Sequence, residues 1–268
     1  MPHVRVGDIQ MHYVEAGEGE PVVLVMGLGG DHLAWGFQVP FLATSYRVIA
    51  FDNRGAGQTD QPDTPYTIRG MARDTVGLLD ALGLERAHIV GASMGGMIAQ
   101  EIALSYPHRV RSLQLHCTLA RPDAYTRALV QAWRVVRSEL SREASLRALA
   151  LWFFAAETWE ARPDFVEMII QTSLDNPYPQ SLPGFLRQTE AILGHDTLDR
   201  LGAIRCPTLV SVGEEDILVP PRFSRQIATR IPGAGLVSLP GAGHLYFMEA
   251  AEAFNAMCLD ALRTSART

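Results

Sequence analysis

Short apolar runs alternate with longer amphipathic stretches through the first half of the chain. Residues 21–26, 46–51 and 87–90 are mainly apolar, which is typical of strands buried on both faces of a sheet. Residues 67–82 have the spacing of an amphipathic helix that stops at Gly83. This alternation predicts a parallel sheet with right-handed crossovers and helices on both faces.

The remaining pattern completes a sheet of eight strands. Residues 3–6 and 9–14 alternate apolar and polar positions around Gly7-Asp8, which predicts an antiparallel hairpin. The expected fold class is therefore α/β, with a mostly parallel eight-stranded sheet. Further strands are expected at 110–115, 207–213 and 235–239, and further helices at 35–42, 221–230 and 246–262.

Between residues 121 and 199 the alternation of strands and helices stops. This stretch is helical by pattern and is broken by Asn176-Pro177-Tyr178-Pro179 and Pro183-Gly184. Sites in open α/β sheets lie at the carboxyl ends of the strands, so we expect a helical cap over that edge. Residues 1–120 and 200–268 then form the predicted core.

Composition and charge narrow the class of protein. The chain has 268 residues, 47% of them hydrophobic, which is enough for a buried core. A net charge of −6 without a basic run argues against a nucleic-acid surface. The widely spaced Cys117, Cys206 and Cys258 lie in apolar segments and are interpreted as buried small side chains, not as a disulfide framework or a metal site.

The stretch Gly91-Ala92-Ser93-Met94-Gly95 fits the pattern Gly-x-Ser-x-Gly. It follows a predicted strand and precedes a predicted helix, which is the context of a tight turn with an exposed serine hydroxyl. Glycine on both sides of Ser93 removes Cβ atoms that would clash with the opposing backbone. We therefore predict that Ser93 is a nucleophile; the alternative is a glycine-rich turn in another kind of α/β protein.

A serine nucleophile needs a general base that is held by a third group. Among the eight histidines, His244 has the clearest position, because it follows the last predicted strand in the loop Pro240-Gly241-Ala242-Gly243. The acid is expected in the loop after the preceding strand. Asp216 is favoured there, and Glu215 is the alternative.

With these motifs the sequence resembles the α/β-hydrolase fold family over nearly its whole length. The chain order Ser93, Asp216, His244 is the order of nucleophile, acid and base in that family, and Asp52-Asn53-Arg54-Gly55-Ala56-Gly57 is a further shared motif. The similarity is closest to small serine esterases and the 3-oxoadipate enol-lactonase type. Haloalkane dehalogenases and epoxide hydrolases carry Asp at the turn, and Ser93 argues against both.

The resemblance also implies an oxyanion hole formed by the backbone N–H groups of Leu28 and Met94. Relatives usually carry His-Gly in the loop after the third strand, whereas this chain has Met26-Gly27. Because the chemistry uses a backbone N–H, Leu28 stays the expected donor. The missing histidine instead changes the support of the loop.

We predict a carboxylic ester hydrolase that cleaves esters or lactones of small, largely apolar substrates through an acyl-enzyme. The alternatives are an enol-lactonase, a C–C bond hydrolase, a cofactor-free haloperoxidase or, outside catalysis, a hydrolase-like ligand receptor. Apolar residues of the cap and the loops are expected to bind the substrate. These residues are Gly27, Trp35, Trp133, Trp152, Phe153, Val219 and Leu245.

The expected location is the cytoplasm. The first residues lack a basic region followed by an apolar run, and no apolar segment approaches the about 18 residues that span a bilayer. We expect no metal and no other cofactor. The predicted partner is the small-molecule substrate, without nucleic acid or membrane, and a homodimer is compatible with the sequence.

Overall fold

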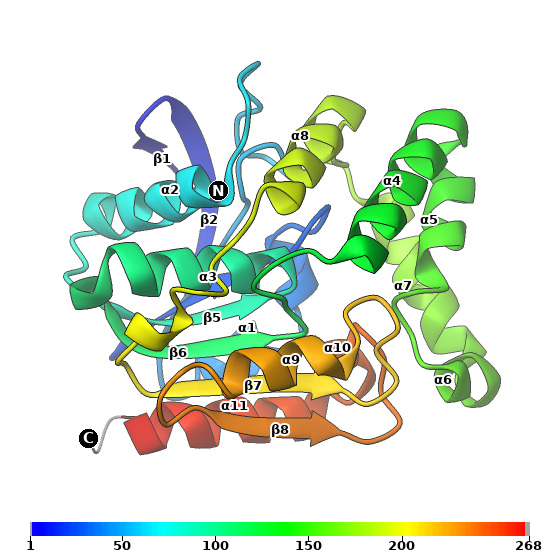
Figure 1. Cartoon of the computed structure of the whole chain (residues 1–268). Helices are drawn as coiled ribbons and strands as arrows, with labels where there is room; N and C mark the ends of the chain where they lie inside the picture. The colour runs from blue at the N-terminus through cyan, green and yellow to red at the C-terminus, as the bar shows by residue number, and fades with distance from the viewer. Residues whose placement is uncertain (1, 266–268) are drawn as a thin grey trace.

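The computed structural model describes residues 2–265, which contain one eight-stranded sheet (Figure 1). Its strand order is β1-β2-β4-β3-β5-β6-β7-β8. The pairs β1–β2 and β2–β4 are antiparallel and the other neighbours are parallel, which confirms the predicted mostly parallel sheet. The strands are β1 (His3–Val6), β2 (Ile9–Ala16), β3 (Pro21–Val25), β4 (Arg47–Phe51), β5 (Ala87–Ala92), β6 (Val110–His116), β7 (Thr208–Gly213) and β8 (Gly235–Leu239).

Alternating side chains of the central strands pack against helices on both faces of the sheet, as expected. In β3, Val23 and Val25 belong to the core on one face, and Val22 and Leu24 to the core on the other. The first face is covered by α2 (Ile68–Ala81), α3 (Met94–Ser105) and α9 (Pro221–Ala228). The second is covered by η1 (His32–Trp35), α1 (Val39–Leu42), α10 (Tyr246–Glu249) and α11 (Ala251–Ser265). Single turns η2 (Pro107–Arg109) and η3 (Leu201–Ala203) connect elements.

Two helices that the pattern predicts as continuous are divided in the structure. The prediction for residues 35–42 was wrong because η1 ends at Trp35 and α1 starts only at Val39. The prediction for residues 246–262 was wrong because the backbone of Ala250 (φ −122°, ψ 47°) leaves the helical region between α10 and α11. Apolar periodicity continues across such a break and therefore does not reveal it.

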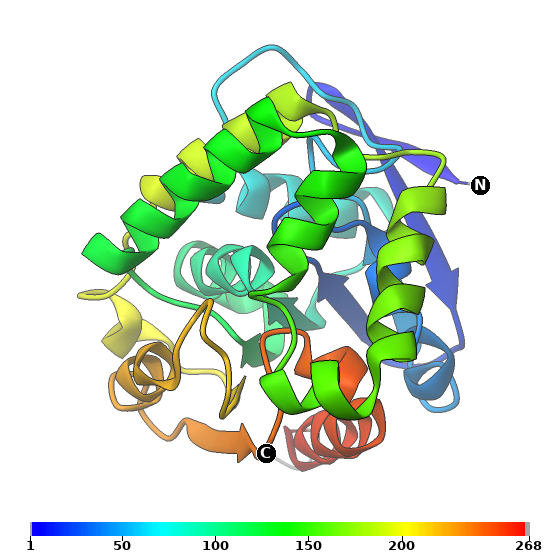
Figure 2. The same cartoon turned by 90° about the vertical axis from the view of Figure 1, so that its right-hand side faces the viewer.

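Five helices between β6 and β7 form a helical cap over the edge at which the parallel strands end (Figures 1 and 2). Local sequence fixes several of their starts: the side chains of Asp123, Ser141 and Ser181 each accept a backbone N–H at the beginning of a helix. The cap helices are α4 (Ala124–Glu139), α5 (Arg142–Ala150), α6 (Ala156–Ala161), α7 (Pro163–Asp175) and α8 (Leu182–Leu193).

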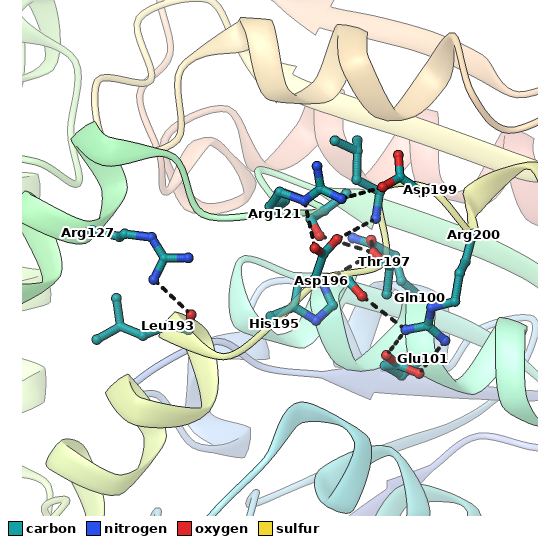
Figure 3. Close-up of polar contacts among 12 residues, drawn as sticks. Gln100, Glu101, Arg121, Arg127, Leu193, His195, Asp196, Thr197, Asp199 and Arg200 are labelled. Atoms are coloured by element: carbon teal, nitrogen blue, oxygen red, sulfur yellow. Dashed lines mark hydrogen bonds and ion pairs between the residues drawn. The ribbon is translucent and has the colours of Figure 1, made fainter.

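The segments that lead into and out of the cap helices lie side by side. Thr197 N–H donates to Ala120 O (2.9 Å), and Arg121 pairs with Asp196 (2.7 Å; Figure 3). Thr197 Oγ1 also donates to Gln100 Oε1 (2.6 Å) on α3. Both connections of the cap are therefore anchored on the helix that follows Ser93.

Within residues 2–265, α4 is the longest helix, with 16 residues. None of the described helices combines the length and the apolar character needed to cross a membrane.

Candidate active site

Ser93 lies at the tip of the turn between β5 and α3. Its backbone is in the left-handed region (φ 56°, ψ −121°), which costs a residue other than glycine on the order of 1–3 kcal/mol. The turn closes only without neighbouring side chains, since a Cβ on Gly91 would lie 2.4 Å from Gly95 O and one on Gly95 would lie 1.9 Å from Val25 O. These close approaches are the physical reason for the Gly-x-Ser-x-Gly pattern.

Two hydrogen bonds hold the strained backbone of Ser93. Ser93 N–H donates to His116 O of β6 (2.9 Å), and Thr118 Oγ1 donates to Ser93 O (2.7 Å). Because α3 begins at Met94, the N–H of Met94 is among those that have no partner inside the helix. These N–H groups and the helix dipole favour negative charge beside Ser93.

The loop after β3 passes directly against Ser93. A Cβ on Gly27 would lie 2.9 Å from Ser93 Cβ, so glycine is needed for this approach. Leu28, the expected N–H donor, is the next residue of the loop and is half-buried.

Two side chains from distant parts of the chain support this loop, where relatives usually have a histidine. Asn53 Nδ2 donates to Met26 O (2.8 Å), and Gly29 N–H donates to Gln188 Oε1 (3.3 Å) of the cap helix α8. Both supporting side chains are buried. The motif of residues 52–57 indicated that Asn53 matters for the site. No sequence pattern indicated Gln188, because it lies 159 positions from its partner Gly29.

Asp216 and His244 lie together in the loops that follow β7 and β8. His244 Nδ1–H donates to Asp216 Oδ2 (2.8 Å), and both side chains are buried. Asp216 Oδ1 accepts the N–H groups of Leu218 (2.9 Å) and Val219 (2.8 Å). Glu215 is exposed, so the structure brings Asp216 to the histidine, and not Glu215.

The bond to Asp216 determines the proton arrangement of His244. A carboxylate only accepts hydrogen bonds, so Nδ1 carries the proton and Nε2 of the neutral imidazole is left as an acceptor. Within residues 2–265, the hydrogen bonds include none between Ser93 Oγ and His244. Catalytic contacts of this kind commonly tighten only when substrate is bound.

Three of the predicted substrate-binding residues form an aromatic cluster in the cap. The ring of Trp133 lies edge-on to Trp152 (centroids 6.0 Å apart) and to Phe153 (5.6 Å). Phe153 in turn stacks on the ring of His244, with centroids 6.4 Å apart and an interplanar angle of 26°. The cluster therefore extends from the interior of the cap to the candidate base.

The other predicted substrate-binding residues lie at different depths. Leu245 N–H donates to Phe153 O (2.9 Å), which places Leu245 beside the aromatic cluster. Val219 is buried, and its N–H is bonded to Asp216. Trp35 has no exposed surface and packs on Phe247 (5.3 Å) in the core beneath the sheet, apart from the aromatic cluster.

One group of side chains in residues 2–265 has the donor types of a metal site. His12, His32 and Asp52 place ligand atoms within 4.8 Å of one another. These side chains already bond to protein groups: His32 Nδ1–H donates to Asp52 (2.7 Å), and Gln58 Nε2 lies 3.2 Å from His12 Nε2. Burial lowers the pKa of His32, but the bond to Asp52 and the negative charges of Asp52 and Asp31 together outweigh burial and raise the pKa. Hydrogen bonds within the protein therefore explain why these three side chains lie close together.

Comparison with protein families identifies the family to which this chain belongs. The profile described as alpha/beta hydrolase fold matches residues 20–251, which include the Ser93 turn and the His244 loop. The chain belongs to the α/β-hydrolase fold family. This membership confirms the resemblance seen in the motifs, and it agrees with the eight-stranded sheet of this α/β hydrolase.

Individual relatives match the α/β hydrolase over almost its whole length. A protein of Azorhizobium caulinodans named "Putative carbamate hydrolase RutD" is 34% identical and is covered to 97%, as is this chain. The crystal structure of the enol-lactonase from Burkholderia xenovorans LB400 has a TM-score of 0.89 at 30% identity, over 98% of this chain and 100% of the other. A thermophilic esterase from Thermogutta terrifontis has a TM-score of 0.87 at 31% identity, over 99% of both chains.

Proposed function

We propose that this α/β hydrolase is a serine hydrolase that cleaves carboxylic esters or lactones of small, largely apolar substrates. The observation that carries the proposal is the buried hydrogen bond of 2.8 Å between His244 and Asp216. It commits Nδ1 of the imidazole to a carboxylate and leaves Nε2 to take a proton from a nucleophile. Ser93, at the turn between β5 and α3, supplies the nucleophile in this proposal.

In the proposed mechanism, His244 Nε2 takes the proton of Ser93 Oγ while this oxygen attacks the substrate carbonyl carbon. Collapse of the tetrahedral intermediate breaks the ester bond, and the leaving alcohol receives the proton from His244. The acyl group is then esterified to Ser93 Oγ. A water molecule, deprotonated by His244, attacks this ester. The bond between the acyl carbon and Ser93 Oγ then breaks, Oγ takes the proton back from His244, and the carboxylic acid leaves.

The backbone N–H groups of Leu28 and Met94 are the proposed donors to the oxyanion. Such a donor contributes about 2.7–4 kcal/mol to the stabilisation of the transition state. The position of Gly27 against Ser93, and that of Met94 at the start of α3, support this assignment.

We assign residues 121–199 to a cap that closes over the site, and residues 1–120 and 200–268 to the core. The aromatic cluster that extends to His244 supports an apolar binding surface under this cap. Esters with an apolar acyl group should therefore react faster than charged ones of similar size.

Carbamates are the second class of substrate that we consider, beside the esters and lactones of the first class. The likeness to a relative named as a putative carbamate hydrolase favours carbamates, whereas the likeness to an enol-lactonase structure favours lactones within the first class. The same three side chains can open a lactone or cleave a carbamate, because each reaction begins with attack on a carbonyl carbon.

The test is hydrolysis of p-nitrophenyl esters of increasing chain length, several lactones and a carbamate by wild type and Ser93→Ala. We expect Ser93→Ala to lower kcat by about 10⁶-fold, to the rate left by binding and the oxyanion hole. Ser224→Ala is the matched control, because Ser224 is a buried serine on α9 whose hydroxyl has no hydrogen bond to Ser93, Asp216 or His244 among the described residues.

Equal turnover by wild type and Ser93→Ala would overturn the proposal. A strong preference for the carbamate over every ester and lactone would select the second class, and a strong preference for lactones over every ester would identify a lactonase within the first class. If no substrate is turned over but ligands raise the melting temperature, the hydrolase-like receptor becomes the better description.

A further inference from the structure

Glu249 is a buried carboxylate that the proposed mechanism does not use. It is the last residue of α10, follows His244 closely in the sequence, and is 8% exposed. Burial of a carboxylate is costly unless its oxygens accept hydrogen bonds. The partners of Glu249 therefore show what this residue does.

One oxygen of Glu249 holds the loop of the candidate base. Gly243 N–H donates to Glu249 Oε2 (2.6 Å), and Gly243 directly precedes His244. The backbone closes the same loop from the other side, because Glu249 N–H donates to Leu245 O (3.0 Å). The residues on both sides of His244 are therefore bonded to Glu249.

The other oxygen of Glu249 holds the cap. Ala155 N–H (2.8 Å) and Thr158 Oγ1 (2.7 Å) both donate to Glu249 Oε1. Ala155 precedes helix α6, which has no capping side chain of its own, so Glu249 supplies the acceptor that such a helix start requires. Arg162 Nη1, at the opposite end of α6, donates a further bond to Glu249 O (2.7 Å).

The cap and the loop also meet backbone to backbone at this place. A Cβ on Gly243 would lie 2.6 Å from Ala155 N. Leu245 N–H donates to Phe153 O (2.9 Å) of the cap. The loop of His244 thus has the cap as one of its walls, and the carboxylate of Glu249 bridges the two.

We propose that Glu249 is a positioning residue for His244, and that it acts by joining the His244 loop to the cap. This inference rests on the proposed function, because it takes His244 as the base. If the acceptor is lost, Gly243, Ala155 and Thr158 are left as buried donors without a partner, and the loop must move to satisfy them. A displacement of about 1 Å at a catalytic group can lower the rate about 10²-fold.

The test compares Glu249→Gln with Glu101→Gln. Glutamine keeps the shape of Glu249 but turns one acceptor oxygen into a donor that faces N–H groups. We expect kcat to fall about 10–100-fold while KM changes less than about twofold. Glu101 is a buried carboxylate on α3 (5% exposed) that pairs with Arg200 and accepts the Ser105 hydroxyl, and not a group of the His244 loop, so Glu101→Gln should keep kcat within about twofold.

Thr158→Val separates the two sides of the bridge. It removes only one bond on the cap side and keeps the bond to Gly243. We expect its kcat to lie between that of wild type and that of Glu249→Gln. An unchanged kcat in Thr158→Val, together with a low kcat in Glu249→Gln, would overturn the role of the cap in this positioning.

A spectroscopic measurement tests the position of His244 without substrate. The low-field proton resonance of His244 Nδ1–H, which is bonded to Asp216, should shift or broaden in Glu249→Gln and stay unchanged in Glu101→Gln. An unchanged resonance in Glu249→Gln, an equal loss of kcat in both variants, or a rise in KM alone would overturn the proposal. If wild type shows no Ser93-dependent turnover, the proposed function fails, and the resonance alone decides on Glu249.

Discussion

At the scale of single residues, burial distinguishes side chains that the sequence leaves equivalent. Asp216 and Glu215 are neighbours with the same functional group, and their position after a predicted strand admits either as the acid. In the structure Asp216 is buried and accepts the N–H groups of Leu218 and Val219, whereas Glu215 is exposed. The hydrophobic pattern locates the loop but does not determine which of its carboxylates turns inward.

Asp216→Asn should separate folding from catalysis. The amide oxygen can still accept the N–H groups of Leu218 and Val219, so we expect the melting temperature to stay close to that of wild type. The NH₂ group cannot accept the proton of His244 Nδ1, so kcat should fall about 10⁴-fold because the imidazole takes the wrong tautomer. Glu215→Gln serves as the control and should keep normal turnover. Near-normal turnover of Asp216→Asn would exclude Asp216 as the acid.

At the scale of elements, local periodicity predicts the strands and the helices that cover them, but not the contacts that the cap makes with the loops of the site. The strand, turn and helix around Ser93 are neighbours in the sequence and share one pattern. The support of the loop after β3 instead depends on Gln188, a cap residue 159 positions from Gly29. A hydrogen bond of this kind leaves no periodic signal in either segment.

Gln188→Met should weaken catalysis through the loop that carries Leu28. Methionine has a similar length but cannot accept the N–H of Gly29, so the loop loses its bond to α8. We expect kcat to fall about tenfold, with a smaller change in KM, because oxyanion donors act mainly in the transition state. The control is Gln171→Met, on an exposed position of α7. If both variants had the same kcat, the cap would have no part in supporting this loop.

At the scale of the whole molecule, the fold buries histidines that it does not use in the site. Burial lowers the pKa of His116 to about 3 and that of His195 to about 4. An unfolded chain has histidines with a pKa near 6.5. As the pH falls below about 6.5, the unfolded state therefore binds protons that the folded state does not, and stability decreases toward about pH 4.

His195→Gln should make stability less dependent on pH in this window. At pH 4, proton binding by His195 in the unfolded state lowers the free energy of unfolding by on the order of 3 kcal/mol. The substitution removes this contribution. We expect the urea midpoint of wild type to fall more steeply than that of the variant between pH 7 and pH 4.5. Other groups titrate in both proteins, so the difference in slope isolates His195. Parallel slopes would show that His195 does not remain neutral in the folded protein.

The hydrogen bond from Thr197 N–H to Ala120 O forms a joint between the two ends of the cap segment. This joint has a consequence for how such proteins diversify. The two ends of the cap segment are already hydrogen-bonded to each other and anchored on α3. The two ends of the segment are therefore held close together whatever lies between them. A change in the length or sequence of the segment does not strain the core. One cap can be exchanged for another by recombination at this joint, provided that the new cap again bonds to Gly29 N–H and to Glu249, and substrate range can then evolve, or be engineered, on the same sheet.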